Sequence, residues 1–393
     1  MPFSHPAAPL VMELLSESIS FYNLAWTVLL VLCMVYWLSV IVGLADMDFL
    51  DVDLDLDGDA DIDKEINVNP TLANMLINRG VQSFDQAKDY FRPSLSQLHD
   101  PFLMKDMDAA VNRIEKAVNN QEKILVYGDY DVDGTTAVAL MYSFLKGFYP
   151  QVEFYIPDRY KEGYGISERG VRFAAENGFS LVIALDCGIK AIDKVKLAKE
   201  LGVDFIICDH HTPGDELPEA VAVLDAKRED CTYPYKELSG CGVGFKLIQA
   251  YAKTHGLEES SLYPYLDLLV VSIAADIVPI TGENRILAYY GLDRINNTPG
   301  PGLKALILQS KVEKEIQISD IVFKIGPRIN ASGRLEHAQA SVELLIAPNL
   351  DDAIERVANA AGDVFGRGGL DGGQLGNCAK TLSELPTVLE LTD

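Results

Sequence analysis

Short apolar runs alternate with helical stretches through the middle of the chain. The apolar runs lie at 123–127, 152–156, 181–185 and 204–208. Helical patterns begin at Thr135, near 167 and near 189, and two more precede the first run at 71–90 and 104–119. Strands that alternate with helices form right-handed βαβ units, so the pattern predicts an α/β fold with a mostly parallel sheet flanked by helices. Such sheets bind their ligands beyond the carboxyl ends of the strands.

Acidic residues and histidines follow three of the four predicted strands. They are Asp129, Asp131 and Asp133 after the first, Asp186 after the third, and Asp209, His210 and His211 after the fourth. If the segment after the first strand stays extended, its three aspartates point the same way. Carboxylates that converge repel one another, and their pKa values rise unless cations neutralise them. Oxygen ligands with one or two imidazoles suit Mn²⁺ or Mg²⁺ better than zinc.

Each of these motifs has a simpler interpretation when it is taken alone. The spacing Asp129-x-Asp131-x-Asp133 resembles the start of an EF-hand loop, although Leu140 stands where that loop needs a glutamate. Asp186 could cap the helix that follows it, and adjacent histidines could be surface residues. The same placement at three strand ends favours a metal site.

The first 69 residues differ from the rest of the chain. Residues 21–45 carry no charge and are long enough to cross a bilayer as a helix, which predicts a membrane segment within 1–45. No Lys or Arg precedes Lys64, so a cleaved signal is disfavoured and the orientation is undecided. The aspartate-rich stretch 46–69 is predicted to be an acidic linker.

The formal charge is −25, from 33 basic and 58 acidic residues. A protein that coats nucleic acid with its whole surface is therefore excluded, because phosphate affinity comes from Lys and Arg that displace counterions. Basic groups confined to one channel remain compatible with a nucleic-acid enzyme.

The six cysteines form no CxxC pair, so reduced thiols in the cytoplasm are expected, with tethering to the inner face of a membrane if 21–45 spans it.

The order of the motifs resembles the DHH phosphoesterase family. The matching stretches are GDYDVDGTT (128–136), ALDCG (184–188), CDHH (208–211) and AADIVPI (274–280). Three further stretches resemble the RecJ branch of that family: 93–110, IPDRYKEGYG (156–165) and GPRINASGRLEHA (326–338). The likeness covers roughly residues 70–360.

The resemblance implies that two Mn²⁺ or Mg²⁺ ions assist hydrolysis of a phosphodiester. Asp131, Asp186 and Asp276 would hold one ion, with Asp129 as a further candidate. Asp133, Asp186 and His210 would hold the other, which makes Asp186 the bridge. His211 would act beside Asp186 as a catalytic residue, through the scissile phosphate or a proton, or would instead orient His210.

The RecJ branch further implies 5′→3′ exonuclease activity on single-stranded DNA with a 5′-phosphate, in DNA repair and recombination. Arg159 is the first candidate for the 5′-phosphate because a guanidinium matches phosphate oxygens. Arg328, Asn330 and Arg334 are candidates for contacts with the strand. Each of these arginines could equally form a surface ion pair. Tyr164 could stack on a base or pack in the core.

The predicted domains after the linker are a helical region at 70–120, the catalytic domain at 121–345, and a helix start with a Gly-rich tail at 346–393. The DHH-associated domain of full-length relatives is not recognisable in that tail, so weak or absent activity is expected. Two other functions stay open: a DHH phosphodiesterase of short oligonucleotides or cyclic dinucleotides, and a non-catalytic membrane-tethered binding module.

Overall fold

The computed structural model describes residues 69–335 and 339–366, which fall into two units, Met1–Ala87 and Lys88–Asp393. The predicted membrane segment at 21–45 and almost all of the predicted acidic linker lie outside the described residues. Within 69–335 and 339–366, no helix combines the length and the apolar character that a membrane span needs. The predicted domain boundaries stay predictions.

The first unit is described only at its end. Helix α4 (Pro70–Ile77) begins after Asn69, whose side-chain oxygen accepts a hydrogen bond from Thr71 N at 2.9 Å. Helix α5 (Phe84–Phe91) begins in this unit and runs on into the second. The single helical stretch predicted at 71–90 is therefore wrong, because the chain turns at Gly80, which has a positive φ.

The second unit is built on a five-stranded sheet whose strands are all parallel, in the order β2-β1-β3-β4-β5. The strands are β1 (Lys123–Gly128), β2 (Val152–Tyr155), β3 (Phe179–Leu185), β4 (Asp204–Cys208) and β5 (Ala222–Leu224). The predicted parallel sheet is confirmed, and β5 is a strand that the sequence analysis did not find. Its three residues are too few for a clear apolar run.

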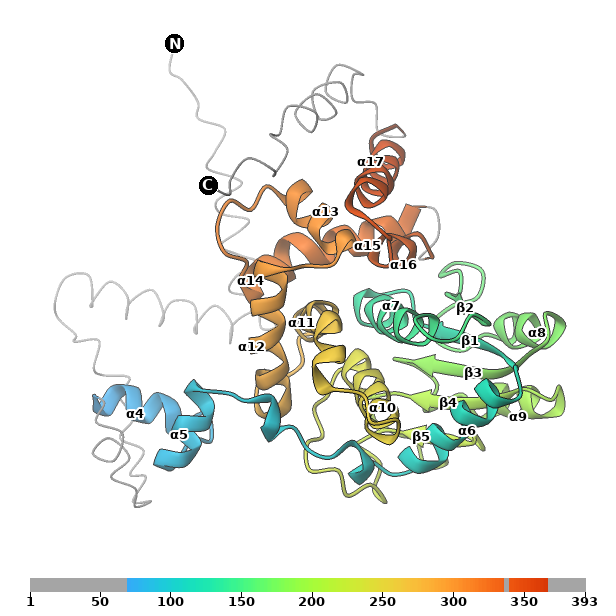
Figure 1. Ribbon diagram of the computed structural model, residues 1–393, viewed down its shortest axis with the longest axis horizontal. Helices are drawn as coiled ribbons and strands as arrows, with labels where there is room; N and C mark the ends of the chain where they lie inside the picture. The colour runs from blue at the N-terminus through green and yellow to red at the C-terminus, as the bar shows by residue number, and fades with distance from the viewer. Residues whose placement is uncertain (1–68, 336–338, 367–393) are drawn as a thin grey trace, which may run out of the picture. The chain divides into compact units, whose positions relative to one another are not determined.

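Helices cover both faces of this sheet (Figure 1). The sheet-flanking helices are α6 (Met107–Asn119), α7 (Val132–Lys146), α8 (Glu168–Glu176), α9 (Ile192–Glu200), α10 (Gly240–Thr254) and α11 (Leu266–Ala275). Alternate residues of β1 point to opposite faces: Ile124 and Val126 join the core formed with α6, α7, α10 and α11. Leu125 and Tyr127 join the core formed with α8 and α9. Strands buried on both sides are typical of a parallel sheet between two helical layers.

The strand order changes direction at β1. The chain leaves β1 through α7 to reach β2 on one side, and β3 then lies on the other side of β1. The loops after β1 and β3 therefore diverge toward opposite faces. The switch point at the carboxyl ends of these two strands, which we call the crevice, is where parallel sheets hold their ligands. The fold places any ligand beside the residues that follow Gly128 and Leu185.

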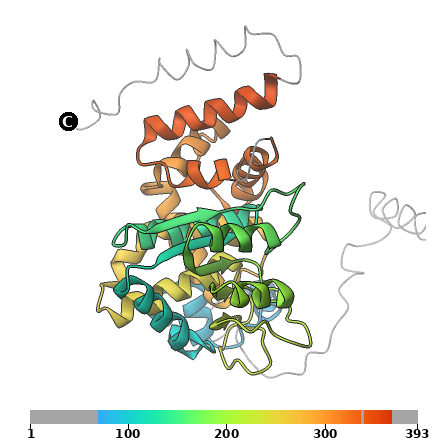
Figure 2. The same cartoon turned by 90° about the vertical axis from the view of Figure 1, so that its right-hand side faces the viewer.

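Further helices follow α11 and extend the same unit. They are α12 (Gly282–Asn297), α13 (Pro301–Ser310), α14 (Ile318–Asp320), the π-helix η5 (Ile321–Ile325), α15 (Gly326–Leu335), α16 (Gln339–Leu345) and α17 (Leu350–Gly366). Short 3₁₀ turns lie at Leu95–Gln97, Pro101–Leu103 and Glu259–Tyr265. Helices α15 and α16 contact α7, and Figure 2 shows the C-terminal helices gathered beyond it.

Candidate metal centre

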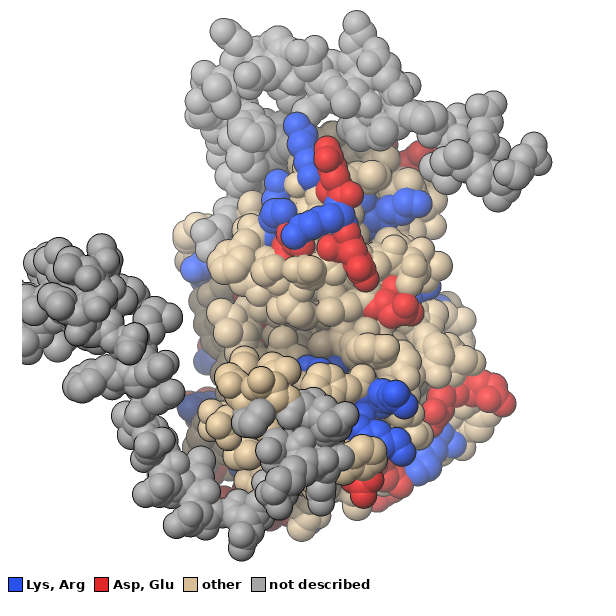
Figure 3. Space-filling view, turned by 90° about the vertical axis from the view of Figure 1, so that its left-hand side faces the viewer, with Lys and Arg blue, Asp and Glu red and all other residues tan. Residues whose placement is uncertain are grey.

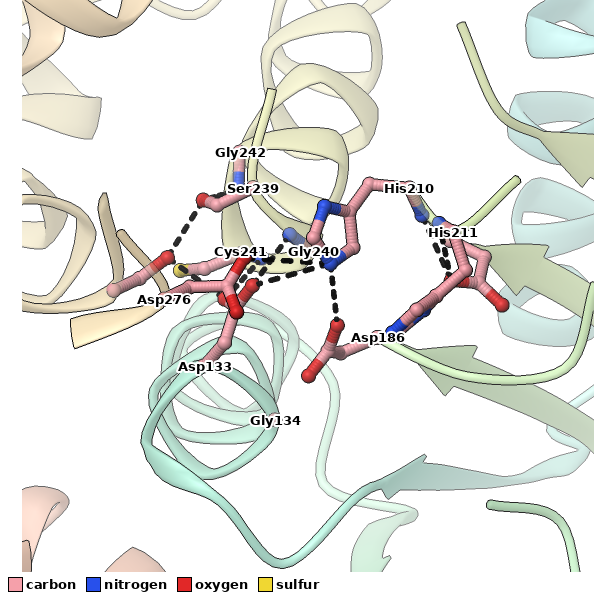
Figure 4. Close-up of polar contacts among 12 residues, drawn as sticks. Asp133, Gly134, Asp186, His210, His211, Ser239, Gly240, Cys241, Gly242 and Asp276 are labelled. Atoms are coloured by element: carbon pink, nitrogen blue, oxygen red, sulfur yellow. Dashed lines mark hydrogen bonds and ion pairs between the residues drawn. The ribbon is translucent and has the colours of Figure 1, made fainter. Parts of the chain in front are cut away.

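Four side chains from separate elements converge at the crevice (Figure 4). His210, after β4, directs its Nε2 atom at three carboxylates. That atom lies 3.1 Å from Asp186 Oδ1, 3.6 Å from Asp276 Oδ2 and 3.8 Å from Asp133 Oδ2. Asp186 follows β3, Asp276 ends α11, and Asp133 lies in the first turn of α7. One imidazole and three carboxylates from β3, β4, α7 and α11 thus lie together.

The Asp133 carboxylate is held in place by the start of α10. Gly240 N donates a hydrogen bond to Oδ2 at 2.7 Å, and Cys241 N donates one to Oδ1 at 2.8 Å. Ser272 Oγ of α11 donates a third, to Oδ1 at 2.7 Å. These three hydrogen bonds, two of them from the N-terminus of α10, fix the position of this buried carboxylate.

Asp186 has a left-handed backbone, with φ of 58°. A non-glycine residue with positive φ is uncommon and costs about 1–2 kcal/mol, so the surroundings must impose it. Gly240 leaves room for the Asp186 side chain, because a Cβ at Gly240 would lie 2.5 Å from Asp186 Oδ1. Ile277, directly after Asp276, also has a positive φ, of 57°. Backbone strain of this kind clusters at functional sites.

The segment after β1 is not extended, so the idea that its three aspartates point the same way is wrong. Asp131 is the N-cap of α7, and its Oδ1 accepts a hydrogen bond from Gly134 N at 2.9 Å. The helix therefore begins at Val132 rather than near Thr135, and Asp133 turns with its first turn. Asp129 lies before the cap, where its Oδ1 accepts a hydrogen bond from Gly165 N at 3.3 Å.

The two adjacent histidines face different partners. His210 points its Nε2 at the carboxylate cluster, whereas His211 places its Nδ1 2.7 Å from Asp209 Oδ1. Asp209 also accepts hydrogen bonds from the backbone nitrogens of His211 and Ile189. Asp209 was predicted only as one of the acids at the strand ends, without a contact of its own. Its signal is its place at the end of β4, where it can bind the histidine two residues on.

Burial and like charge raise the pKa of most carboxyls in the cluster. Burial, with Asp131 as the next cause, raises the pKa of Asp129 to about 7. Burial, followed by the charge of Asp133, raises the pKa of Asp276 to about 7 and that of Asp186 well above its usual range. Burial lowers the pKa of His210, so its imidazole is neutral at neutral pH. Carboxyls of this kind are stabilised as anions when cations are present.

The donor set fits divalent cations. Asp129 Oδ2 and Asp186 Oδ1 are buried and accept no hydrogen bond from any described residue, although His210 Nε2 lies 3.1 Å from the latter. Two sets of ligand atoms lie within 4.8 Å of one another: those of Asp186, His210 and His211, and those of Asp133, His210 and Asp276. Both sets share His210 rather than the predicted bridge Asp186, and Asp129 and Asp131 belong to neither. The division of ligands between two ions stays a prediction.

The predicted substrate-binding residues lie outside this cluster, on the loop after β2 and on helix α15. Arg159 places its guanidinium 5.0 Å from the ring centroid of Tyr130, next to the first aspartates. Arg328 donates a hydrogen bond to Lys324 O at 2.6 Å, and Asn330 is half-buried on the same helix α15. Arg334 is described by its backbone alone. On the face drawn in Figure 3, Lys and Arg lie among Asp and Glu rather than forming one basic area.

The part of the chain that forms the sheet and most of the cluster matches a known protein family. Residues 123–273 match the DHH family, N-terminal domain. The chain is 43% identical over 296 residues to the single-stranded-DNA-specific exonuclease RecJ of Bacillus subtilis, covering 75% of this chain and 37% of that protein. It is 32% identical over 296 residues to the Escherichia coli protein of the same name, covering 72% and 51%. The chain thus spans about half the length, or less, of these curated relatives.

Solved structures resemble this one as well. A crystal structure of exonuclease RecJ bound to manganese superposes with a TM-score of 0.61 and 32% identity, covering 74% of this chain and 69% of that one. RecJ of Thermus thermophilus in complex with Mn²⁺ gives a TM-score of 0.65 and 29% identity, covering 82% and 44%. The parallel sheet with its flanking helices is therefore the fold of these proteins.

Proposed function

The chain belongs to the DHH family, and from this membership we propose that it hydrolyses phosphodiester bonds of single-stranded DNA as a metal-dependent 5′→3′ exonuclease. One observation carries the proposal: His210 Nε2 lies within 3.8 Å of the carboxylates of Asp133, Asp186 and Asp276 at the switch point of the sheet. The similarity to exonucleases of that activity and to manganese-bound structures supports the same reaction.

Two Mn²⁺ or Mg²⁺ ions are proposed as cofactors. When bound, they lower the pKa of a water molecule and stabilise the charge that develops on phosphate oxygens. Asp133, Asp186, Asp276 and His210 would hold them, with Asp129 and Asp131 as further ligands. Burial keeps His210 neutral, so its Nε2 offers a lone pair. The hydrogen bonds to Asp133 from α10 and α11 orient that carboxylate before any ion arrives.

His211 is proposed as the catalytic histidine. The hydrogen bond to Asp209 raises the pKa of His211, and it places the proton of the neutral ring on Nδ1. Burial raises the pKa of Asp209, but the hydrogen bonds and charge of His211 outweigh burial and lower it. Asp209 is therefore a stable anion that orients His211. Nε2 of His211 lies 3.2 Å from the Tyr164 hydroxyl, and a phosphate oxygen or a proton would replace that contact during the reaction.

The 5′-phosphate is proposed to bind Arg159, which lies beside Tyr130 and the first aspartates. Arg328, Asn330 and Arg334 are proposed to contact the strand. Their helix α15 supports this role because it begins next to the cluster: a Cβ at Gly326 would lie 3.6 Å from Ala275 and 4.0 Å from Val132. These two residues precede Asp276 and Asp133, so a strand that crosses the crevice would pass the start of α15.

The test is release of mononucleotides from 5′-phosphorylated single-stranded DNA in the presence and absence of Mn²⁺. The control is Asp186→Asn, because asparagine tolerates the left-handed backbone of this residue and removes only the charge. We expect Mn²⁺-dependent release by the chain and a loss of at least about a hundredfold in the variant. Equal release by both proteins would contradict the metal mechanism.

The substrate in the same assay separates the other functions. Cleavage confined to dinucleotides or cyclic dinucleotides would identify a phosphodiesterase of short substrates, and binding without cleavage would identify a non-catalytic module. Membrane association through 21–45 and a cytoplasmic location stay predictions, which fractionation of expressing cells would test.

A further inference from the structure

We propose that Tyr164 is a positioning residue that fixes the ring of His211 in the crevice, an inference that rests on the proposed nuclease function. The Tyr164 hydroxyl lies 3.2 Å from His211 Nε2, and the two rings meet edge to face with centroids 6.1 Å apart. Asp209 Oδ1 lies 2.7 Å from the other ring nitrogen, Nδ1. His211 is thus held at both nitrogens, by an acid on one side and a phenol on the other.

The direction of these two hydrogen bonds follows from chemistry. An ionised carboxylate can only accept, so His211 Nδ1 donates to Asp209. When the ring is neutral, Nε2 carries a lone pair, and the Tyr164 hydroxyl at 3.2 Å donates to it. A histidine that could rotate about two bonds is reduced to one orientation, with Nε2 at the mouth of the crevice.

Tyr164 also separates the roles of the two histidines. The atoms of Asp186, His210 and His211 lie close enough together to hold a cation. His211 could join such a site only through Nε2, because Nδ1 is taken by Asp209. The Tyr164 hydroxyl occupies that nitrogen, so it keeps His211 free of the metal while His210 faces three carboxylates.

The loop that carries Tyr164 is built to hold the ring there. The Glu162 carboxylate accepts hydrogen bonds from Tyr155 Oη at 2.9 Å, Asp158 N at 3.0 Å and Ser167 Oγ at 2.6 Å, which ties the two ends of the loop together. Gly163 and Gly165 both have positive φ, a backbone that a side chain would strain. These constraints explain how a tyrosine that is 54% exposed can keep a defined position.

Tyr130 supports the ring from another side. The Tyr130 and Tyr164 rings meet edge to face with centroids 6.0 Å apart, a favourable aromatic geometry. Tyr160, on the same loop, is 81% exposed. The two loop tyrosines therefore differ in their contact with His211, which of the pair only Tyr164 makes.

The kinetic test compares Tyr164→Phe with Tyr160→Phe in the full chain, with Mn²⁺ and 5′-phosphorylated single-stranded DNA. The phenylalanine keeps the ring and removes one hydrogen bond, so we expect kcat of the Tyr164 variant to fall about threefold to tenfold with KM unchanged. The Tyr160 variant should match the parent. Unchanged kcat in the Tyr164 variant would overturn the proposal. A rise in KM alone would also overturn it, since the hydroxyl would then contact the substrate and not position the histidine.

A second readout does not depend on turnover. In the chain labelled with ¹⁵N-histidine, His211, assigned through His211→Gln, should show a proton on Nδ1 and a hydrogen-bonded Nε2. Tyr164→Phe should move the Nε2 resonance to that of a free lone pair, and an unmoved resonance would overturn the proposal. If the parent cleaved no substrate, this comparison would still decide whether Tyr164 fixes the ring, so failure of the nuclease function is distinguishable.

Discussion

His210 and His211 are neighbours in the sequence but have separate roles at the site. His210 meets three carboxylates, and His211 is bound by Asp209 and Tyr164. Residue types and their order predict both histidines as site residues, and the structure places both just after β4. The division between them depends on the torsion of each side chain and on a tyrosine 47 residues away, which no local pattern contains.

Gly240 gives a prediction at the residue scale. A Cβ at this position would lie 2.5 Å from Asp186 Oδ1 and 2.6 Å from Asp186 Cβ, so Gly240→Ala should displace the aspartate and weaken Mn²⁺ binding by at least about tenfold. Isothermal titration of Mn²⁺ measures this. The control is Gly242→Ala in the same turn of α10, where the nearest atom is Ser239 Oγ at 3.3 Å. Equal affinity of the two variants would contradict the steric argument.

At the scale of elements, the sequence predicts the strands that carry the site better than the helices beside them. Four strands and the parallel sheet are visible as apolar runs, and three of these runs are followed within two residues by Asp129, Asp186 or Asp209. The start of α7 was placed too late because Asp131 acts as a helix cap, a role that competes with metal ligation in the interpretation of an aspartate. The π-helix η5 has no distinct sequence pattern.

The loop between β2 and α8 depends on one glutamate. Glu162→Ala leaves the Tyr155 and Ser167 hydroxyls without their acceptor, so the free energy of unfolding should fall by about 1–3 kcal/mol. Urea denaturation measures the change. Glu153→Ala, an exposed glutamate on β2, should alter it by less than about 0.5 kcal/mol. A loss of the same size in both variants would mean that the loop is not held by Glu162.

A buried ion pair joins α10 to α12. Lys246 Nζ lies 2.6 Å from Glu283 Oε1, and both side chains are almost fully buried. Lys246 also donates to His99 O, and His99 N donates to Glu283, so the pair ties the segment before α6 to the core. Lys253 is on the same helix and pairs with Asp100, but both of those side chains are exposed.

These two lysines allow a matched comparison of stability. Lys246→Ala leaves Glu283 buried without its partner and should cost about 3–5 kcal/mol of unfolding free energy. Lys253→Ala breaks an exposed pair and should cost at most about 1 kcal/mol. Chemical denaturation of both variants measures these losses. Similar losses of unfolding free energy would show that burial does not determine how much each ion pair contributes to stability.

At the scale of the whole molecule, the metal-ligand cluster accounts for only part of the excess of acidic residues. The carboxyls of the cluster are concentrated at one sheet edge, whereas the net charge of −25 belongs to the full chain. The mixture of signs on the face in Figure 3 agrees with the expectation that the chain does not bind nucleic acid through its whole surface. The strand-end pattern, rather than composition, made the site predictable.

The raised pKa values predict how pH acts on metal-dependent stability. The pKa of Asp129 and of Asp276 is about 7 in the folded chain, above its ordinary value of 3.8, so without metal these groups favour folding less as pH rises through that interval. Divalent cations bind the ionised form, and protons compete with them. The rise in Tm caused by Mn²⁺ should therefore be larger at about pH 8 than at about pH 6. A rise that shrinks or stays constant with pH would contradict this linkage.

Direct titration of Mn²⁺ into the metal-free chain, with Asp186→Asn as the matched variant, is the most direct test that the acids at the strand ends form a metal centre. The expected result is saturable binding of two ions by the parent, with at least one lost in the variant. The absence of saturable binding, or the same binding curve for both proteins, would contradict the metal centre and the hydrolysis proposed to depend on it.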